Sequence, residues 1–134
     1  MSAPSEKAQM VSEWFSYAQT DIKAAEALTK ELDNFAGQIC FHSQQAVEKA
    51  IKAALIFLDV EFPYIHDLNK LRKLLPQEWT FCKEQIDLNM LSRWAVHSRY
   101  PETATKPTLG QANAALEEAK KAVSLIELDL KKVG

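Results

Sequence analysis

The chain has 134 residues, a length typical of one compact domain. Apolar residues make up 47% of it and charged residues 25%, which is enough apolar material for a core and excludes general intrinsic disorder. Sixteen Lys plus Arg against eighteen Asp plus Glu give a formal net charge of -2. This balance excludes the overall basic excess of a protein that binds a nucleic-acid backbone, so any such contact needs a local patch.

Targeting signals and membrane spans are not evident in the sequence. The N-terminal residues lack a basic segment followed by an apolar one, and the longest apolar run, residues 53–58, is far shorter than the roughly 20 residues of a membrane span. Cys40 and Cys82 form no C-x-x-C pair. We therefore expect a cytoplasmic protein with free thiols, without membrane contact, folded as a single domain over residues 1–134 with an ordered core of about 7–132.

Two long helices are predicted in the first half of the chain. The first covers roughly residues 7–32, and its apolar residues recur at steps of three and four. They are Met10, Trp14, Tyr17, Ala18, Ile22, Ala25 and Leu28. Asp33 and Asn34 are good N-cap types and precede a second helix from Phe35 to about Asp59. The second helix is so long and apolar that we expect it at the centre of a bundle.

A short helix is predicted after the second long one. Pro63 indicates a turn, His66 or Asp67 is positioned to cap the opening amides of the short helix, and Pro76 closes it. No alternating pattern of a strand competes with these helices.

Two further helices are predicted in the second half of the chain. One runs from about Phe81 to Ser98, with an apolar face formed by Phe81, Leu88, Leu91 and Ala95. Thr108 and Gln111 have the spacing of a capping box and open the final helix. Its apolar stripe consists of Ala115, Leu116, Ala119, Val123, Ile126 and Leu130. The expected fold is an all-α, up-and-down bundle of four main helices plus one short helix.

The second helix carries a row of polar residues within the segment FHSQQAVEKAIKA. At 100° per residue, the row falls within an arc of about 80° and consists of His42, Gln45, Lys49 and Lys52. A phosphate or a base could lie along it. The alternative is an ordinary solvated face, because an apolar side opposes it, formed by Cys40, Val47, Ala54 and Leu58.

Two other places carry residues with possible chemistry. His66 either caps its helix and packs against a neighbour, or contacts a ligand at the mouth of a groove. Arg93 and His97 are four residues apart on one helical face, and Arg99 and Tyr100 follow at the end of that helix. Basic side chains here either interact with the helix macrodipole or contribute to a site.

Metal sites and common enzyme motifs are not evident. Cys40 and His42 are two apart and project about 200° apart on a helix, and the three histidines and two cysteines show no zinc spacing. The sequence has no Gly-rich phosphate loop, no G-x-S-x-G and no H-E-x-x-H. We expect no metal and no cofactor.

Three segments in order, FHSQQAVEKAIKA, PYIHDL and SRYP, followed by a capped final helix, resemble the HEPN (higher eukaryotes and prokaryotes nucleotide-binding) domain. The resemblance is to small, stand-alone prokaryotic members with an Arg-Tyr-Pro motif. It extends from about Trp14 to Leu130, and the family's first helix is matched by Trp14, Ala18, Asp21 and Ala25. It implies an up-and-down helical bundle that forms a homodimer and is often encoded beside a nucleotidyltransferase.

The resemblance also implies a site. In the Arg-Tyr-Pro subgroup, the polar residues of the second helix and the Arg-Tyr pair are the proposed nucleotide or substrate ligands. The corresponding residues here are His42, Gln45, Lys49, Arg99 and Tyr100, and His66 is added from its place in PYIHDL. We therefore expect a non-catalytic protein that binds a nucleotide, a nucleotidyltransferase partner or both, including as one half of a toxin–antitoxin type pair.

Two alternatives stay open. Many other members of the family that this sequence resembles are ribonucleases, in which an Arg is followed after four to six residues by a His and the pair meets its copy across a dimer. Arg93 and His97, with three intervening residues, depart from that spacing, and RNA is a partner only under this alternative. Tyr100 lies three residues after His97, near the place where some toxin pairs carry a modified Tyr. The third hypothesis is a purely structural interaction module.

Overall fold

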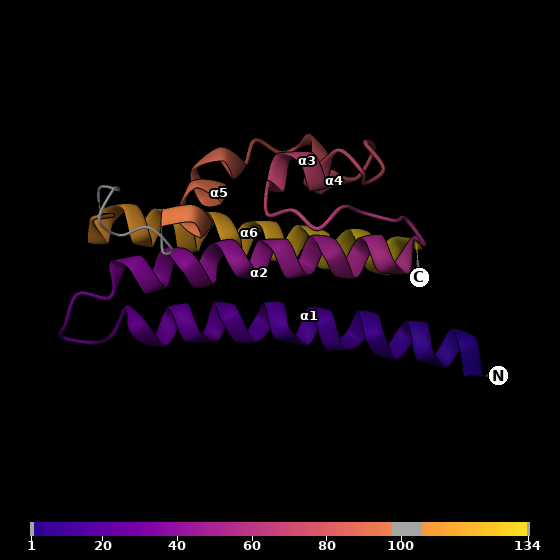
Figure 1. Cartoon of the computed structure of the whole chain (residues 1–134), viewed down its shortest axis with the longest axis horizontal. Coiled ribbons are helices and arrows are strands. Elements are labelled where there is room, and N and C mark those ends of the chain that lie inside the picture. The colour runs from indigo at the N-terminus through magenta and orange to yellow at the C-terminus, as the bar shows by residue number, and fades with distance from the viewer. Residues whose placement is uncertain (1, 98–105, 134) are drawn as a thin grey trace.

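Three long helices lie side by side along the long axis of the molecule, and three shorter ones pack on two of them, on the side away from the first long helix (Figure 1). The computed structural model describes residues 2–97 and 106–133, with side chains for residues 6–93 and 106–133. The helices are α1 (Ser2–Leu28), α2 (Ala36–Phe57), α3 (Leu68–Arg72), α4 (Thr80–Lys83), α5 (Leu88–His97) and α6 (Leu109–Val133). The expected all-α bundle is confirmed.

Helix α2 occupies the centre, as its length and apolar composition predicted. It packs against α1, α6, α5 and α3. Alanines with no exposed surface occur along all three long helices and allow the helix axes to approach closely. They are Ala18, Ala25, Ala46, Ala50, Ala53, Ala54, Ala112, Ala115, Ala119 and Ala122. Because α2 is covered by four neighbours, little of its surface is left for solvent.

The buried face of α1 is narrower than predicted. Ala18 and Ala25 are fully buried, but Met10 is 49% exposed and Tyr17 is 57% exposed. The prediction that these two large residues belong to the buried face is wrong. The reason is that α1 packs chiefly on α2, with a smaller contact to α6, so only one narrow stripe of the helix is covered.

The predicted single helix over residues 81–98 is divided into α4 and α5. The backbone at Glu84 is extended, with φ -76 and ψ 146, which ends α4. Oδ1 of Asp87 then accepts a hydrogen bond from the N–H of Met90 at 3.0 Å, at the start of α5. An extended residue followed by a new capping side chain therefore interrupts the helical pattern.

The apolar faces predicted for the second half of the chain are nevertheless buried. The residues concerned are Phe81, Leu88, Leu91, Ala115, Leu116, Ala119, Val123 and Ile126. Leu130 is half-buried and packs against this core. The side chain of Ala95 lies outside the described residues.

Local capping signals agree with the structure in three places. Thr108 and Gln111 form the predicted capping box: each side-chain oxygen accepts the other's backbone N–H, at 3.0 and 2.9 Å. Asp67 caps α3 by accepting two N–H groups of its first turn, at 3.0 and 3.2 Å. Of the two residues proposed as this cap, Asp67 has the role and His66 does not. Asn34 accepts the first N–H of α2 at 2.9 Å.

Asp129 of α6 holds the start of α4 in place. Its side chain accepts the backbone N–H groups of Thr80 and Phe81, at 3.1 and 3.0 Å, and the residue is only 3% exposed. Both bonds have an ionisable acceptor, which strengthens them. Asp129 therefore connects the covering segment to the long-helix layer.

We predict that Asp129→Asn lowers the free energy of unfolding by about 2 kcal/mol, because the amide offers one neutral acceptor oxygen and turns an NH2 donor toward the other buried N–H. Urea unfolding followed by circular dichroism measures the change. Asp33→Asn, at an exposed position between α1 and α2, is the matched control. Equal stabilities of the two variants would contradict this role of Asp129.

Membrane-spanning character is absent from the described helices. Within residues 2–97 and 106–133, no helix combines the length and the apolar character needed to cross a bilayer.

Candidate functional site

The polar row of α2 meets two buried carboxylates. One is Asp21 of α1, 8% exposed, and the other is Glu48 of α2 itself, 5% exposed. Lys52 is 4% exposed, and the other three members of the row are half-buried. The row is therefore not a fully solvated face, because its lysines and His42 pair with these carboxylates and Gln45 pairs with Gln44.

Asp21, His42 and Lys49 form one group, which we call the Asp21 cluster. Nδ1 of His42 donates to Oδ1 of Asp21 at 2.8 Å, and Nζ of Lys49 donates to Oδ2 at 2.6 Å. The ring of His42 packs edge-on against Phe41, with centroids 5.7 Å apart. Its Nε2 has no hydrogen-bond partner among the described residues, and the side chain is 31% exposed. The cluster thus orients an imidazole and an ammonium at the surface.

Glu48 organises the second group, which we call the Glu48 cluster. Its carboxylate accepts hydrogen bonds from Lys52 Nζ at 2.9 Å, His66 Nδ1 at 2.9 Å and Gln44 Nε2 at 2.8 Å. Gln45 donates in turn to Oε1 of Gln44 at 2.8 Å. Three of the sequence-predicted residues therefore belong to this cluster, namely Gln45, Lys52 and His66.

The pKa of Glu48 reflects a competition between burial and pairing. Burial disfavours the charged form and by itself raises the pKa of the carboxyl. Hydrogen bonds from Lys52, Gln44 and His66, together with the charge of Lys52, outweigh burial and hold the pKa below its ordinary value of 4.5. Glu48 is therefore ionised at neutral pH, although it lies inside the fold.

The segment between α2 and α3 covers one side of the Glu48 cluster. The ammonium of Lys52 lies 5.8 Å from the ring centre of Phe62 and 5.3 Å from that of Tyr64. The ring of Tyr64 also meets that of His66 edge-on, with centroids 6.4 Å apart. This segment therefore places two aromatic rings and an imidazole beside a buried ion pair.

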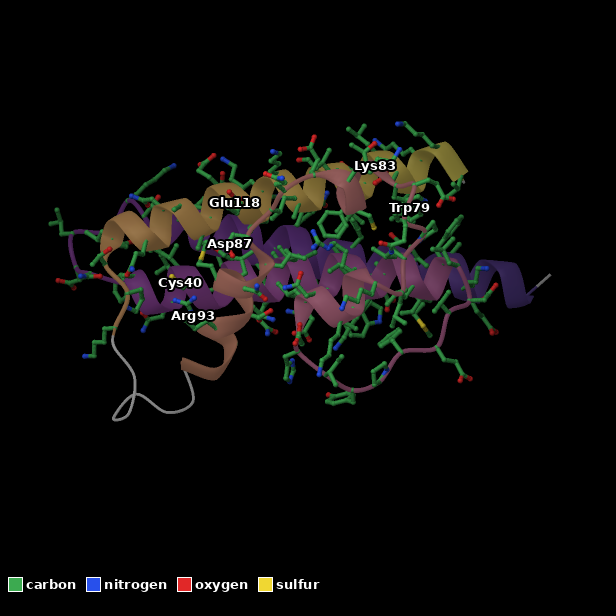
Figure 2. All side chains as sticks on the ribbon, turned by 90° about the horizontal axis from the view of Figure 1, so that it is seen from above. Cys40, Trp79, Lys83, Asp87, Arg93 and Glu118 are labelled. Atoms are coloured by element: carbon green, nitrogen blue, oxygen red, sulfur yellow. The ribbon has the colours of Figure 1, made fainter. Side chains whose placement is uncertain are left out.

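Of the remaining sequence-predicted residues, only Arg93 has a described side chain. Arg93 is exposed on α5, toward the opposite end of the bundle from Trp79 and Lys83 (Figure 2). No hydrogen bond or ion pair joins it to either cluster among the side chains that are described. His97 is the last residue of α5, but its side chain lies outside the described part, as do Arg99 and Tyr100.

Sequence reasoning missed three residues of the site. Gln44 and Glu48 are four residues apart, and so are Glu48 and Lys52. Helical side chains interact at this spacing, so a search of the sequence for such pairs would find both residues. Asp21 pairs across two helices, and no local pattern indicates that contact.

The described side chains contain no cluster of metal ligands, and both cysteines are free thiols. Within them, no three His, Cys, Asp or Glu gather as a metal site would require. Both cysteines are free, as expected, and burial raises the pKa of Cys40 to about 12, so its thiol is not ionised at neutral pH. The clusters offer hydrogen bonds and charges to a ligand.

A separate groove lies between α1 and α6. It has a volume of about 730 Å³, and its lining includes the apolar residues Phe15, Phe57 and Leu130 beside polar ones such as Ser12 and Gln19. Of the predicted ligand residues with described side chains, namely His42, Gln45, Lys49 and His66, none lines it. This groove is an alternative ligand-binding place to the two clusters, and it offers more apolar surface than they do.

We predict that Glu48→Gln destabilises the protein most at neutral pH. The folded pKa of Glu48 lies below the unfolded one, so its contribution to stability is present above about pH 4.5 and is lost as the pH falls through the folded pKa. The gap in free energy of unfolding between wild type and variant should therefore narrow below that pH. Urea unfolding at a series of pH values measures it.

The control for this series is Glu117→Gln, because the side chain of Glu117 is 73% exposed. Its effect should be small at every pH. If the difference in free energy of unfolding between wild type and Glu48→Gln stays constant from neutral to acid pH, the carboxylate is not held in its charged form by its partners.

Comparisons with known proteins agree with this architecture. The structure is similar to the crystal structure of TT1696 from Thermus thermophilus, with a TM-score of 0.73, 22% identity and coverage of 89% of this chain and 97% of that chain. It is also similar to ST0689, an archaeal HEPN homologue, with a TM-score of 0.67, 22% identity and coverage of 87% and 94%. At this identity the likeness shows the fold alone. No curated protein matches the sequence significantly.

The family assignment rests on a sequence model together with the fold. The model of the HEPN domain matches residues 11–129, which include all six helices in whole or in large part. Both carboxylates of the two clusters, and all the side chains they bind, lie inside the matched range. The chain belongs to the HEPN domain family.

Proposed function

We propose that this protein binds a nucleotide along the polar row of α2, between α1 and the segment before α3, without catalysing a reaction. The observation that carries the proposal is the pair of buried carboxylates, Asp21 and Glu48, each holding a lysine and a histidine. Burying charged groups costs free energy, and a well-packed apolar substitute is often as stabilising. A purely structural helix gains little from this arrangement, so ligand binding is the better explanation.

The exposed parts of the clusters have the chemistry that a nucleotide requires. Lys49 is held by Asp21 but keeps 28% of its side chain exposed, so its ammonium can also meet a phosphate oxygen. Nε2 of His42 can hydrogen-bond to a phosphate or a sugar hydroxyl. The charges of the two carboxylates and the two lysines balance, so a further cation is needed to neutralise a bound phosphate. We assign this role to Arg99, which the family resemblance places at the site.

We predict that Lys49→Ala and Arg99→Ala remove the thermal stabilisation that a nucleotide gives to the wild-type protein. ATP and GTP are the probes, each with and without magnesium. Stabilisation of wild type should reach about 2.7 kcal/mol when the free nucleotide is 100-fold above its Kd. A thermal-shift series measures the stabilisation by nucleotide, and calorimetric titration measures the Kd.

Two further variants separate loss of ligand contacts from loss of stability. Lys49→Ala also removes a partner of Asp21, so Gln45→Ala, which leaves both carboxylate–lysine pairs in place, tests the row without that loss. Lys132→Ala, exposed in the last turn of α6, is the matched control and should respond like wild type. If all variants respond to nucleotide as wild type does, the ligand does not use this row.

Ribonuclease activity is the second candidate function. The observation in its favour is that α5 extends from Leu88 to His97, so Arg93 and His97 belong to one helix and lie one turn apart. Our proposal predicts that purified protein does not cleave RNA, with or without magnesium. Cleavage by wild type that is absent from His97→Ala at equal concentration would replace nucleotide binding by catalysis as the function.

A homodimer and a nucleotidyltransferase partner belong to the same proposal. Their support is the resemblance of the three sequence segments to small HEPN proteins, together with membership of the family. Two exposed apolar residues of α1, Met10 and Tyr17, offer surface for such a contact.

A further inference from the structure

Tyr64 is held in an exposed position by an ordered turn. The residue is 93% exposed, while its neighbours Phe62 and Ile65 pack against the core. The N–H of Ile65 donates to the carbonyl oxygen of Pro63 at 2.9 Å, a three-residue turn with Tyr64 at its centre. His66, the next residue but one, is anchored to Glu48. The backbone on both sides of Tyr64 is therefore fixed, and the ring is presented to solvent.

The ring of Tyr64 is also polarised from inside the protein. The ammonium of Lys52 lies 5.3 Å from the ring centre, within the range of a cation–π interaction. Lys52 is buried and bound to Glu48, so this charge is fixed in place. Because Tyr64 as a whole is 93% exposed, the ring face turned away from Lys52 is open. A flat group could therefore cover it without displacing any protein contact.

We propose that Tyr64 is the stacking platform for the base of the bound nucleotide and that it favours a purine. This inference rests on the proposed nucleotide binding and identifies which part of the ligand lies where. Aromatic side chains stack on every nucleobase, and preferences among bases follow stacking strength. A purine has two fused rings and covers more of the tyrosine face than a pyrimidine does.

With the base on Tyr64, the two ends of the ligand lie at different clusters. The base lies on Tyr64, next to the Glu48 cluster. The phosphate end lies toward Lys49 and His42 of the Asp21 cluster, since their exposed polar atoms are the ones that suit an anion. From Lys52 to His42, α2 advances ten residues, or about 15 Å. The platform and the phosphate-binding end are thus separate parts of one elongated site.

A single exposed aromatic ring suits a small planar ligand better than a protein partner. Protein-binding patches are contiguous apolar surfaces of several hundred square ångströms. Around Tyr64 the neighbouring rings of Phe62 and His66 are half-buried, and the underlying groups are charged. We therefore assign the ring to a base.

The test compares binding of a nucleoside and its nucleotide, because only the nucleotide carries phosphate. Adenosine and ATP are titrated into wild type, Tyr64→Ala, Tyr64→Leu and Tyr64→Phe, with uridine and UTP as the pyrimidine pair. We expect Tyr64→Ala and Tyr64→Leu to weaken adenosine and ATP alike, by about 10-fold, which is the size of one stacking contact. Tyr64→Phe, which keeps the ring, should retain binding. Leu32→Ala, another fully exposed apolar position, is the control.

The outcomes separate this inference from the proposed function. If wild type binds ATP and Tyr64→Ala binds it equally well, the platform is wrong while nucleotide binding stands. If uridine binds wild type as tightly as adenosine, the purine preference is wrong. If wild type binds none of the four probes, both the platform and nucleotide binding are overturned. Lys49→Ala should weaken ATP more than adenosine, and an equal loss of both would contradict the assigned orientation.

Discussion

Helix α2 is enclosed by its neighbours, and this enclosure determines where its polar groups can lie. Four other helices pack against it, so its polar side chains cannot simply extend into water. Each must find a partner within the fold or at the narrow strip that stays open. Asp21 and Glu48 provide these partners and fix a histidine and a lysine apiece. Packing thus converts an amphipathic helix face into an ordered polar surface.

The two clusters have different exposure, and this gives them different parts in the proposed binding. In the Glu48 cluster the lysine is buried and acts on the ring of Tyr64 above it. In the Asp21 cluster the lysine and His42 each keep about a third of their side chains exposed and can touch a ligand directly. The order along α2 places a flat, polarised surface at one end and hydrogen-bonding groups at the other. Such an arrangement suits a ligand with an aromatic end and an anionic end.

Local signals in the sequence were sufficient for most of the fold and for some residues of the two clusters. Periodicity located the long helices, and the Thr108–Gln111 capping box located the start of α6, because both depend on neighbouring residues. The break at residues 84–87 has a local signal in Asp87, a good N-cap type that periodicity alone overlooks. The pairing of Asp21 with α2 and the exposure of Tyr64 depend on how distant segments pack, so no local pattern contained them.

Nucleotide binding at the polar row of α2 and the adjoining segment can be checked residue by residue. Amide NMR spectra of isotope-labelled protein titrated with ATP are suited to this, since each residue reports its own surroundings. We expect shift changes concentrated in residues 42–52 and 62–66. Changes confined to the groove between α1 and α6, around Phe15 and Leu130, or no changes at saturating nucleotide, would refute the proposed site.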